Sequence, residues 1–280
     1  MNSFLSWVGG KKALRDAVLA RFPPYYERYI EVFGGGGWVL FHKPPGAEME
    51  VYNDFNSNLT NLYRCVRDNP TRLEQELRYV LNAREDFNLV AALHKNGDFT
   101  GLADYDRAAK FYQLIRYSYA SGLDSFGSQP HSMWANFPLI DLAARRLQKV
   151  VIENKDFEKL IGQYDRPVSF FYCDPPYYAT ESYYKDVGFT AADHERLRDS
   201  LLKCTGKFLL SYNDCPEIRA LWDRPGIHIE AISRMNNLAQ RYDGGCLYEE
   251  LLISNYDTSE RSKMCKQLSF LDMNESEVLQ

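Results

Sequence analysis

The sequence predicts a doubly wound α/β fold with a mainly helical insertion, and three observations support this class. First, the apolar, β-favouring run 168–173 ends in an acid and two prolines, as a buried strand does where it opens into a rigid loop. Second, the β-favouring run 29–33 is followed by four glycines and then by the apolar segment 38–41. Third, helical spacing dominates from 57 to 150. A chain of 280 residues is long enough for one large domain with an insertion.

Composition and charge limit the class of protein. Hydrophobic residues make up 45% of the chain and charged residues 25%, as in ordinary globular proteins. The net charge is −5, yet residues 107–149 carry six lysines and arginines against two aspartates. We therefore expect an acidic protein with one basic face that suits phosphates.

Cysteine usage and hydropathy bear on the compartment. The six cysteines form no Cys-x-x-Cys pair, so neither a zinc site nor a disulfide framework is indicated, and a reducing cytoplasm fits best. The sequence shows no signal peptide and no apolar run near 18 residues, which argues against secretion and membrane insertion.

The glycine turn has the strand, turn and helix order of nucleotide-binding folds. Glycine lacks a Cβ atom, so Gly34–Gly37 would let a ligand lie against the backbone. A Gly-x-Gly-x-x-Gly fingerprint would need glycine at 39 or 40, where the chain has Val39 and Leu40. This disfavours a nicotinamide cofactor.

An acid follows the second predicted strand, 49–54. Asp54 lies about 20 residues beyond the glycines, where a carboxylate can accept both hydroxyls of a ribose. Alternatively, Asp54 caps the next helix, which carries Leu59, Leu62, Tyr63 and Val66 on one face. Both uses can coexist if Asn56 or Ser57 takes the cap.

The opening segment places a Gly-Gly pair before Lys11 and before helical spacing at Leu14, Val18 and Leu19. A lysine at such a turn can approach an anionic group, although a surface lysine is the simpler explanation.

The insertion contains helical spacing and then a polar stretch. The spacing recurs in two runs: Leu73, Leu77, Val80 and Leu81, and Ala108, Phe111, Tyr112 and Ile115. We expect Phe111 and Tyr112 to lie in the core. Residues 116–131 are small, polar and aromatic with two glycines, which predicts an exposed loop or hairpin able to enter a groove, or one without a partner.

The C-terminal half returns to strands and helices. Asp156 and Phe157 follow a strand at 149–155, where the acid could cap a helix. A Thr/Asp cap predicts a helix after 190, with His194 on its surface. Strands follow at 207–212, 227–232 and 247–255, with a polar loop at 233–245 and a weakly ordered tail after 257.

The residues Asp174-Pro175-Pro176-Tyr177 have a specific chemical use. The exocyclic amine of a nucleobase is a poor nucleophile because its lone pair is delocalised into the ring. If a carboxylate and a main-chain carbonyl both accept hydrogen bonds from this amine, they favour tetrahedral nitrogen and free the lone pair. Pro175 has no N–H, and Tyr177 offers a face on which an extruded base can stack. The alternative is a simple strand followed by an Asx-Pro turn.

Together with Trp7-Val8-Gly9-Gly10-Lys11, Glu31 to Gly37, and Asn53-Asp54, this string resembles the Dam-type family of DNA adenine methyltransferases. The match covers the N-terminal fifth and the C-terminal half. The resemblance implies a Rossmann-like methyltransferase sheet, mostly parallel with an antiparallel pair near the C-terminus. It also implies a catalytic domain formed by 1–56 and 151–257, a target-recognition domain at 57–150, and a tail at 258–280.

The resemblance further implies site-specific methylation of adenine N6 in double-stranded DNA, with S-adenosylmethionine as cofactor and no metal. The implied catalytic residues are Asp174, Pro175, Pro176 and Tyr177. The implied cofactor-binding residues are Trp7, Lys11, Phe33, Gly34, Asp54, Asp156, Phe157 and Asp174. Of these, Asp156 and Phe157 would hold and cover the cofactor adenine, as an alternative to the helix cap at Asp156. The candidate DNA-binding residues are Arg116, Tyr119, Ser121, Ser125, Gln129, Asn236 and Arg241. A monomer is compatible with the sequence.

Three alternatives remain at this point. Methylation of cytosine N4 needs the same amine chemistry, but Ser is more usual than Asp at position 174 in cytosine enzymes. Enzymes that methylate RNA or protein glutamine resemble an Asn-Pro-Pro-Tyr pattern instead. A catalytically silent DNA-binding protein would not need Trp7, Lys11, Asp54 and Asp174 intact.

Overall fold

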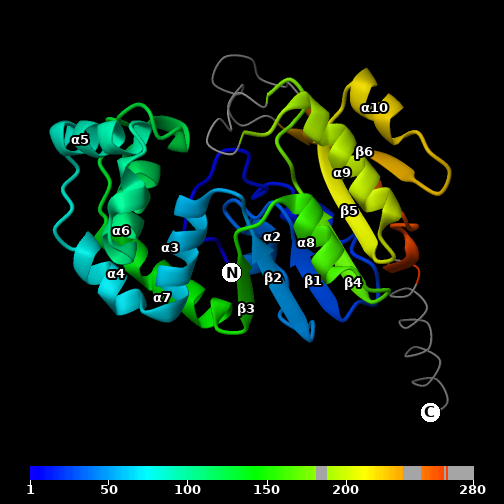
Figure 1. Cartoon of the computed structure of the whole chain (residues 1–280), viewed down its shortest axis with the longest axis horizontal. Helices are drawn as coiled ribbons and strands as arrows, with labels where there is room; N and C mark the ends of the chain where they lie inside the picture. The colour runs from blue at the N-terminus through cyan, green and yellow to red at the C-terminus, as the bar shows by residue number, and fades with distance from the viewer. Residues whose placement is uncertain (181–187, 236–246, 262, 264–280) are drawn as a thin grey trace, which may run out of the picture. The chain divides into compact units, whose positions relative to one another are not determined.

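The computed structural model describes residues 1–180, 188–235, 247–261 and 263. The described residues form a mixed seven-stranded sheet in the order β3-β2-β1-β4-β5-β7-β6, accompanied by helices (Figure 1). The predicted α/β class is therefore confirmed. The chain divides into two compact units, Met1–Lys12 with Phe33–Asp156, and Ala13–Val32 with Phe157–Gln280. Each unit is described by itself.

The first unit contains two parallel strands and most of the helices. Strands β2 (Met49–Asn53) and β3 (Val150–Glu153) pair from Glu50 opposite Val150 to Asn53 opposite Glu153. The helices are α2 (Trp38–His42), α3 (Ser57–Asp68), α4 (Pro70–Leu77), α5 (Arg84–Lys95), α6 (Asp104–Tyr117) and α7 (Phe137–Leu147). Short 3₁₀ turns lie at η1 (Asp98–Gly101), η2 (Tyr119–Ser121) and η3 (Trp134–Asn136).

Local chemistry explains where these helices begin and end. Asn56 caps α3, because its side chain accepts hydrogen bonds from Asn58 N at 3.0 Å and Leu59 N at 3.1 Å. The predicted helical run Leu73, Leu77, Val80 and Leu81 extends beyond the observed helix, because α4 ends at Leu77. Beyond it Leu81 is 65% exposed. As predicted, Phe111 and Tyr112 are buried.

A buried ion cluster connects three elements of the first unit. Glu50 of β2 is paired with Lys43, at the C-terminal end of α2, and with Arg146 of α7. Arg146 Nη2 lies 3.0 Å from Glu50 Oε1. Lys43 and Glu50 are both buried, so neither charge has water as a substitute partner.

The second unit contains the other five strands. Strands β1 (Arg28–Glu31), β4 (Ser169–Cys173) and β5 (Lys207–Asn213) are parallel neighbours. Strand β7 (Leu247–Ser254) runs antiparallel between β5 and β6 (His228–Met235). All five residues of β4 are buried, and four of them form the apolar and aromatic run Phe170–Cys173.

Among its described residues, the second unit also contains the helices α1 (Arg15–Leu19), α8 (Phe157–Tyr164), α9 (Ala191–Lys203) and α10 (Pro216–Trp222). Figure 1 shows α8 and α9 running side by side. The predicted Thr/Asp cap of α9 is a capping box formed by Thr190 and Asp193. In the described part of the chain, no helix combines the length and apolar character needed to cross a membrane.

Candidate functional site

The glycine turn of the first unit is a tightly packed backbone feature. Gly34 N donates to Asn53 O at 2.7 Å, and Gly37 N donates to Gly34 O at 2.7 Å. Gly35 and Gly37 have φ values of +48° and +62°, which side-chain-bearing residues rarely adopt. A Cβ atom on Gly34 would come within 3.0 Å of the Tyr52 ring. Glycine is therefore required here by conformation and by packing.

Two tyrosine hydroxyls form hydrogen bonds to the main chain of the glycine turn. The hydroxyls of Tyr52 and Tyr63 both donate to Gly35 O, at 2.7 and 3.2 Å. Their rings are stacked with centroids 4.0 Å apart. The peptide of Gly35 is thus fixed on its carbonyl side by two side chains.

Asp54 fixes the same peptide on its amide side. Its Oδ2 accepts from Gly35 N at 2.9 Å and its Oδ1 from Asn56 N at 2.8 Å. Because Asn56 caps α3, the alternative in which Asp54 takes the cap is wrong. Burial raises the pKa of Asp54 to about 6, although the two backbone hydrogen bonds oppose the shift. A carboxylate is thereby held at the turn, in a place where its charge is costly.

Trp7 and Lys11 lie in the same unit as the turn. A Cβ atom on Gly35 would be 2.9 Å from Trp7 Cδ1, so the indole packs directly on the glycine. Trp7 also contacts Phe111, with ring centroids 5.9 Å apart. Lys11 is only 7% exposed, and its Nζ lies 3.5 Å from Gly9 O. The simpler explanation for Lys11, a surface lysine, is wrong.

The other expected cofactor contacts fall on both units. Phe33 and Asp156 of the first unit are half-buried, and Asp156 directly precedes α8. Phe157 of the second unit is buried, and its ring centroid lies 6.0 Å from that of Phe189. The Arg196 guanidinium lies 4.3 Å from the Phe157 ring centroid. The choice between an adenine contact and a helix cap for Asp156 stays open.

In the second unit, the tip of β4 carries the candidate catalytic acid. Asp174 follows the last residue of the strand, and its Oδ1 accepts a hydrogen bond from Ser211 Oγ of β5 at 2.9 Å. Pro175 and Pro176 are buried, whereas Asp174 and Tyr177 are half-buried. The carboxylate is therefore held by a neighbouring strand and remains partly accessible.

Tyr177 is held by residues from β5 and β7. Its hydroxyl donates to Glu250 Oε2 at 2.7 Å, and Glu250 is 1% exposed. Its ring lies 6.1 Å from that of Tyr212. Burial, followed by the charges of Asp174 and Glu250, raises the pKa of Tyr177 well above its ordinary value. The phenol therefore stays protonated and anchored at its outer end.

Behind Tyr177 lies a buried histidine. His194 is 2% exposed, and its Nδ1 lies 2.7 Å from the Tyr212 hydroxyl. The expectation that His194 lies on the helix surface is wrong. Instead, α9 turns this residue inward, where it supports the ring that contacts Tyr177.

The stretch predicted to be an exposed loop or hairpin forms, in the first unit, a turn closed by an isolated bridge. Ser118 and Phe126 form an antiparallel bridge, and Tyr119 N donates to Ser125 O at 2.7 Å. We call residues 118–126 the recognition turn. Tyr119 is 72% exposed, and Ser125 is exposed beside it.

The remaining candidate DNA contacts are placed differently. Ala120, Ser121 and Leu123 have positive φ values, which is unusual for residues with side chains. Arg116 lies in the last turn of α6 with a half-buried side chain, and Gln129 is exposed. Asn236 and Arg241 lie outside the described residues.

Sequence reasoning missed three buried residues that hold the site: Ser211, Tyr212 and Glu250. Glu250 gave a signal, because an acid within an apolar strand is costly unless it is paired. Among the described residues, no group of three or more His, Cys, Asp or Glu side chains could hold a metal ion.

Comparisons with known proteins agree with this fold. A family model, D12 class N6 adenine-specific DNA methyltransferase, matches residues 7–237. Type II methyltransferase M1.LlaDCHI of Lactococcus lactis subsp. cremoris is 27% identical over 91% of this chain and 96% of its own length. Type II methyltransferase M.MjaIII of Methanocaldococcus jannaschii is 29% identical over 91% of this chain and 99% of its own. DNA adenine methylase of Escherichia coli K12 is 28% identical over 83% of this chain and 88% of its own length.

The mixed sheet and its glycine turn define a Rossmann-like α/β methyltransferase. The chain belongs to the D12 class of N6 adenine-specific DNA methyltransferases, which confirms the predicted family and activity. Its substrate is DNA, and its reaction requires a methyl donor. The cytosine and the catalytically silent alternatives are thereby set aside.

Proposed function

We propose that the enzyme transfers a methyl group from S-adenosylmethionine to N6 of an adenine flipped out of duplex DNA. The observation that carries this proposal is the tip of β4. There a carboxylate held by Ser211 precedes two buried prolines and a tyrosine anchored on Glu250. One rigid turn thus presents an acceptor, Asp174, and an aromatic ring, Tyr177.

This turn suits activation of an aromatic amine. Asp174 and the Pro175 carbonyl accept hydrogen bonds from the two N6–H groups, which favours tetrahedral nitrogen and releases its lone pair. The fixed φ of proline keeps that carbonyl in place. After methyl transfer, N6 carries a positive charge and an extra proton. The Asp174 carboxylate, which already accepts a hydrogen bond from N6–H, takes up that proton. Tyr177 stacks on the adenine.

The chemistry of the first unit fits S-adenosylmethionine. The Asp54 carboxylate suits ribose hydroxyls, and the Lys11 ammonium suits the carboxylate of the methionine part. Trp7, Phe33 and Gly34 would form the surface around them, while Asp156 and Phe157 would hold and cover the adenine. When bound, this cofactor supplies an electrophilic methyl group on a sulfonium. Asp174 would also contact the cofactor.

The recognition turn fits duplex DNA. Tyr119 and Ser125 are exposed on a turn braced by main-chain hydrogen bonds, and such a turn can present side chains to base edges. Arg116, Ser121 and Gln129 belong to the same proposed contact, as do Asn236 and Arg241. The enzyme is proposed to act as a monomer.

Tritium transfer from labelled S-adenosylmethionine into plasmid DNA tests the mechanism. Asp174→Ala should lower the rate by about 10²- to 10³-fold, the usual loss when one preorganised electrostatic group is removed. Asp214→Ala is the matched control, since Asp214 follows β5 as Asp174 follows β4 and pairs with Arg219. Nucleoside analysis should find the label in N6-methyladenine. Undiminished transfer by the Asp174 variant would remove the mechanism.

A further inference from the structure

We propose that the connection between α4 and α5 is a second DNA-contacting element, next to the recognition turn. This second contact surface consists of Arg78, Tyr79, Leu81, Asn82, Arg84 and Trp134. The inference rests on the proposed function in taking duplex DNA as the partner.

The connection exposes large side chains that a free protein does not normally leave in water. Tyr79 is 83% exposed and Leu81 is 65% exposed, whereas Leu73 and Leu77 of the preceding helix are fully buried. Trp134 is also exposed. Clustered exposed apolar and aromatic groups mark surfaces that become covered by a partner.

The connection is fixed to the segment that follows the recognition turn. Trp134 Nε1 donates to Arg78 O at 3.0 Å, and the Arg78 guanidinium lies 5.6 Å from the Trp134 ring centroid. Asn82 Nδ2 donates to Gln129 O at 3.2 Å. These contacts order both segments before any partner arrives, so little conformational entropy is lost on binding.

The connection also contacts the recognition turn itself. The Arg84 guanidinium lies 4.8 Å from the ring centroid of Phe126, the last residue of the turn. Phe87 packs against the same ring at 5.5 Å. A duplex that touches the recognition turn therefore has the α4–α5 connection beside it, within the first unit.

The local positive charge of this surface favours duplex DNA as the partner. Residues 78–84 and 116–134 together carry three arginines and one aspartate, a balance of +2 on a chain whose net charge is −5. Arginine, amide and aromatic side chains together are the contacts that proteins make with phosphates, sugars and bases. The acids Glu85 and Asp86 follow in the first turn of α5, where their negative charges interact favourably with the helix dipole. They lie beyond the edge of the proposed surface.

Fluorescence anisotropy with labelled fragments of a plasmid that the wild-type enzyme methylates tests the inference. Each arginine that neutralises a phosphate contributes about 0.9 to the slope of log K against log salt concentration. The double variant Arg78→Gln/Arg84→Gln should therefore lower that slope by about 2 and weaken binding at moderate salt. Tyr79→Ser should weaken binding about fivefold with an unchanged slope, because it removes contact area and no charge.

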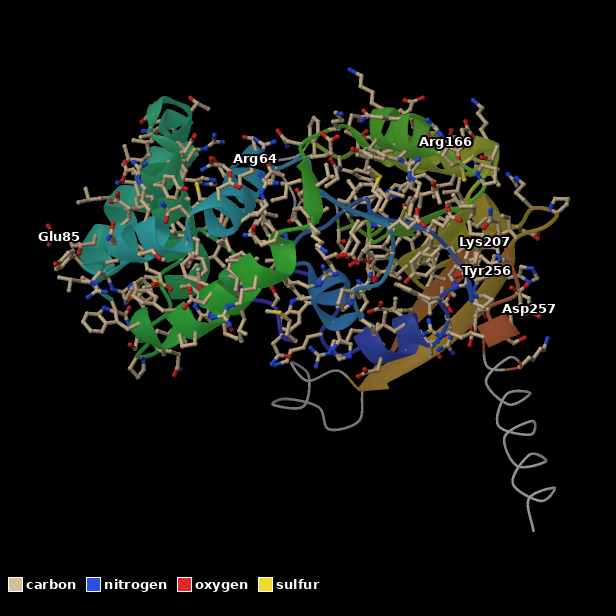
Figure 2. All side chains as sticks on the ribbon, turned by 90° about the horizontal axis from the view of Figure 1, so that it is seen from below. Arg64, Glu85, Arg166, Lys207, Tyr256 and Asp257 are labelled. Atoms are coloured by element: carbon tan, nitrogen blue, oxygen red, sulfur yellow. The ribbon has the colours of Figure 1, made fainter. Side chains whose placement is uncertain are left out.

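Two control variants bracket these effects. Arg64→Gln removes one positive charge, as each half of the double variant does, from an exposed residue of α3. Figure 2 shows Arg64 well away from Glu85, which lies in the first turn of α5 beside the proposed surface. This variant should bind DNA as wild type does. Glu85→Gln removes an acid at the edge of the surface and should strengthen binding.

The outcomes separate this inference from the proposed function. Wild-type slope and affinity in the double arginine variant and in Tyr79→Ser would overturn the inference, while methylation by the wild-type enzyme would leave the proposed function intact. A change in sedimentation rather than in DNA binding would identify a second copy of this chain as the occupant, which also overturns it. Tyr79→Ser guards against misfolding, because the side chain is almost fully exposed.

Discussion

Replacing Ser211 with alanine isolates the hydrogen bond that holds Asp174. Ser211 is fully buried on β5, and its hydroxyl donates to Asp174 Oδ1 at 2.9 Å. A hydrogen bond to a charged group contributes about 1.5–3 kcal/mol. Because Asp174 is half-buried, water can replace part of the lost bond, so we expect the lower end, about 1.5 kcal/mol.

This loss should be visible in catalysis rather than in cofactor affinity. A cost of about 1.5 kcal/mol in the transition state lowers kcat/KM for DNA about tenfold. The fall should lie in kcat, since Ser211 orients the acid that activates the amine. The KM for the methyl donor should stay within about twofold, because the proposed cofactor contacts of the first unit are untouched.

Ser254→Ala is the matched control for Ser211→Ala. Ser254 is also fully buried, on the adjacent strand β7, and its hydroxyl donates to Tyr256 O at 2.7 Å. Both variants lose a buried hydroxyl and should unfold at similarly lower denaturant concentrations. Steady-state methylation rates for the two proteins, measured side by side, provide the assay. Equal kcat values would refute the reasoning that Ser211 acts through Asp174.

Three further predictions concern the first unit. Affinity for S-adenosylmethionine should fall as the pH drops through about 6, because protonated Asp54 loses acceptor capacity; calorimetric titration between pH 8 and 5 measures this. Gly34→Ala should destabilise the protein by about 1–3 kcal/mol or more through overlap with Tyr52, whereas Gly46→Ala, with open space around it, should be nearly neutral in urea unfolding. Glu50→Gln should cost about 3–5 kcal/mol in the same assay, since it leaves two cations uncompensated.

Each of these predictions has a contrary outcome. Affinity that is flat across the pH range, or equally pH-dependent in Asp54→Asn, would show that this carboxylate does not bind the cofactor. Equal stability of the two glycine variants would mean that the Tyr52 ring moves aside at no cost. A Glu50→Gln variant as stable as wild type would mean that water or another group compensates the cations.

The sequence predicted those features that are encoded by short local patterns. The continuous apolar run before Asp174 marks a strand that is buried on both faces, and β4 is such a strand. The four glycines mark a turn with positive φ, which Gly35 and Gly37 adopt. The capping box at Thr190 follows from a single Thr-x-x-Asp spacing.

Contacts between distant strands could not be predicted in the same way. The bond between Tyr177 and Glu250 joins residues that are 73 positions apart, and it depends on β7 pairing with β5 in one register. His194 was misplaced although it shares a helix face with Leu197 and Leu201, because a polar imidazole was expected to face solvent. Leu81 was misplaced because four apolar residues at helical spacing do not show where the helix stops.

The proposed DNA contacts of the first unit lie within the insertion from α3 to α7, and this has a consequence for how specificity could change. These helices all lie in the single crossover between β2 and β3, whose strands pair directly, with Asn53 opposite Glu153. A parallel crossover needs only about a dozen residues, so nearly all of residues 54–149 exceed what connectivity demands. We therefore expect that the segment could be exchanged between relatives, because the two strand ends that receive it are already paired with each other.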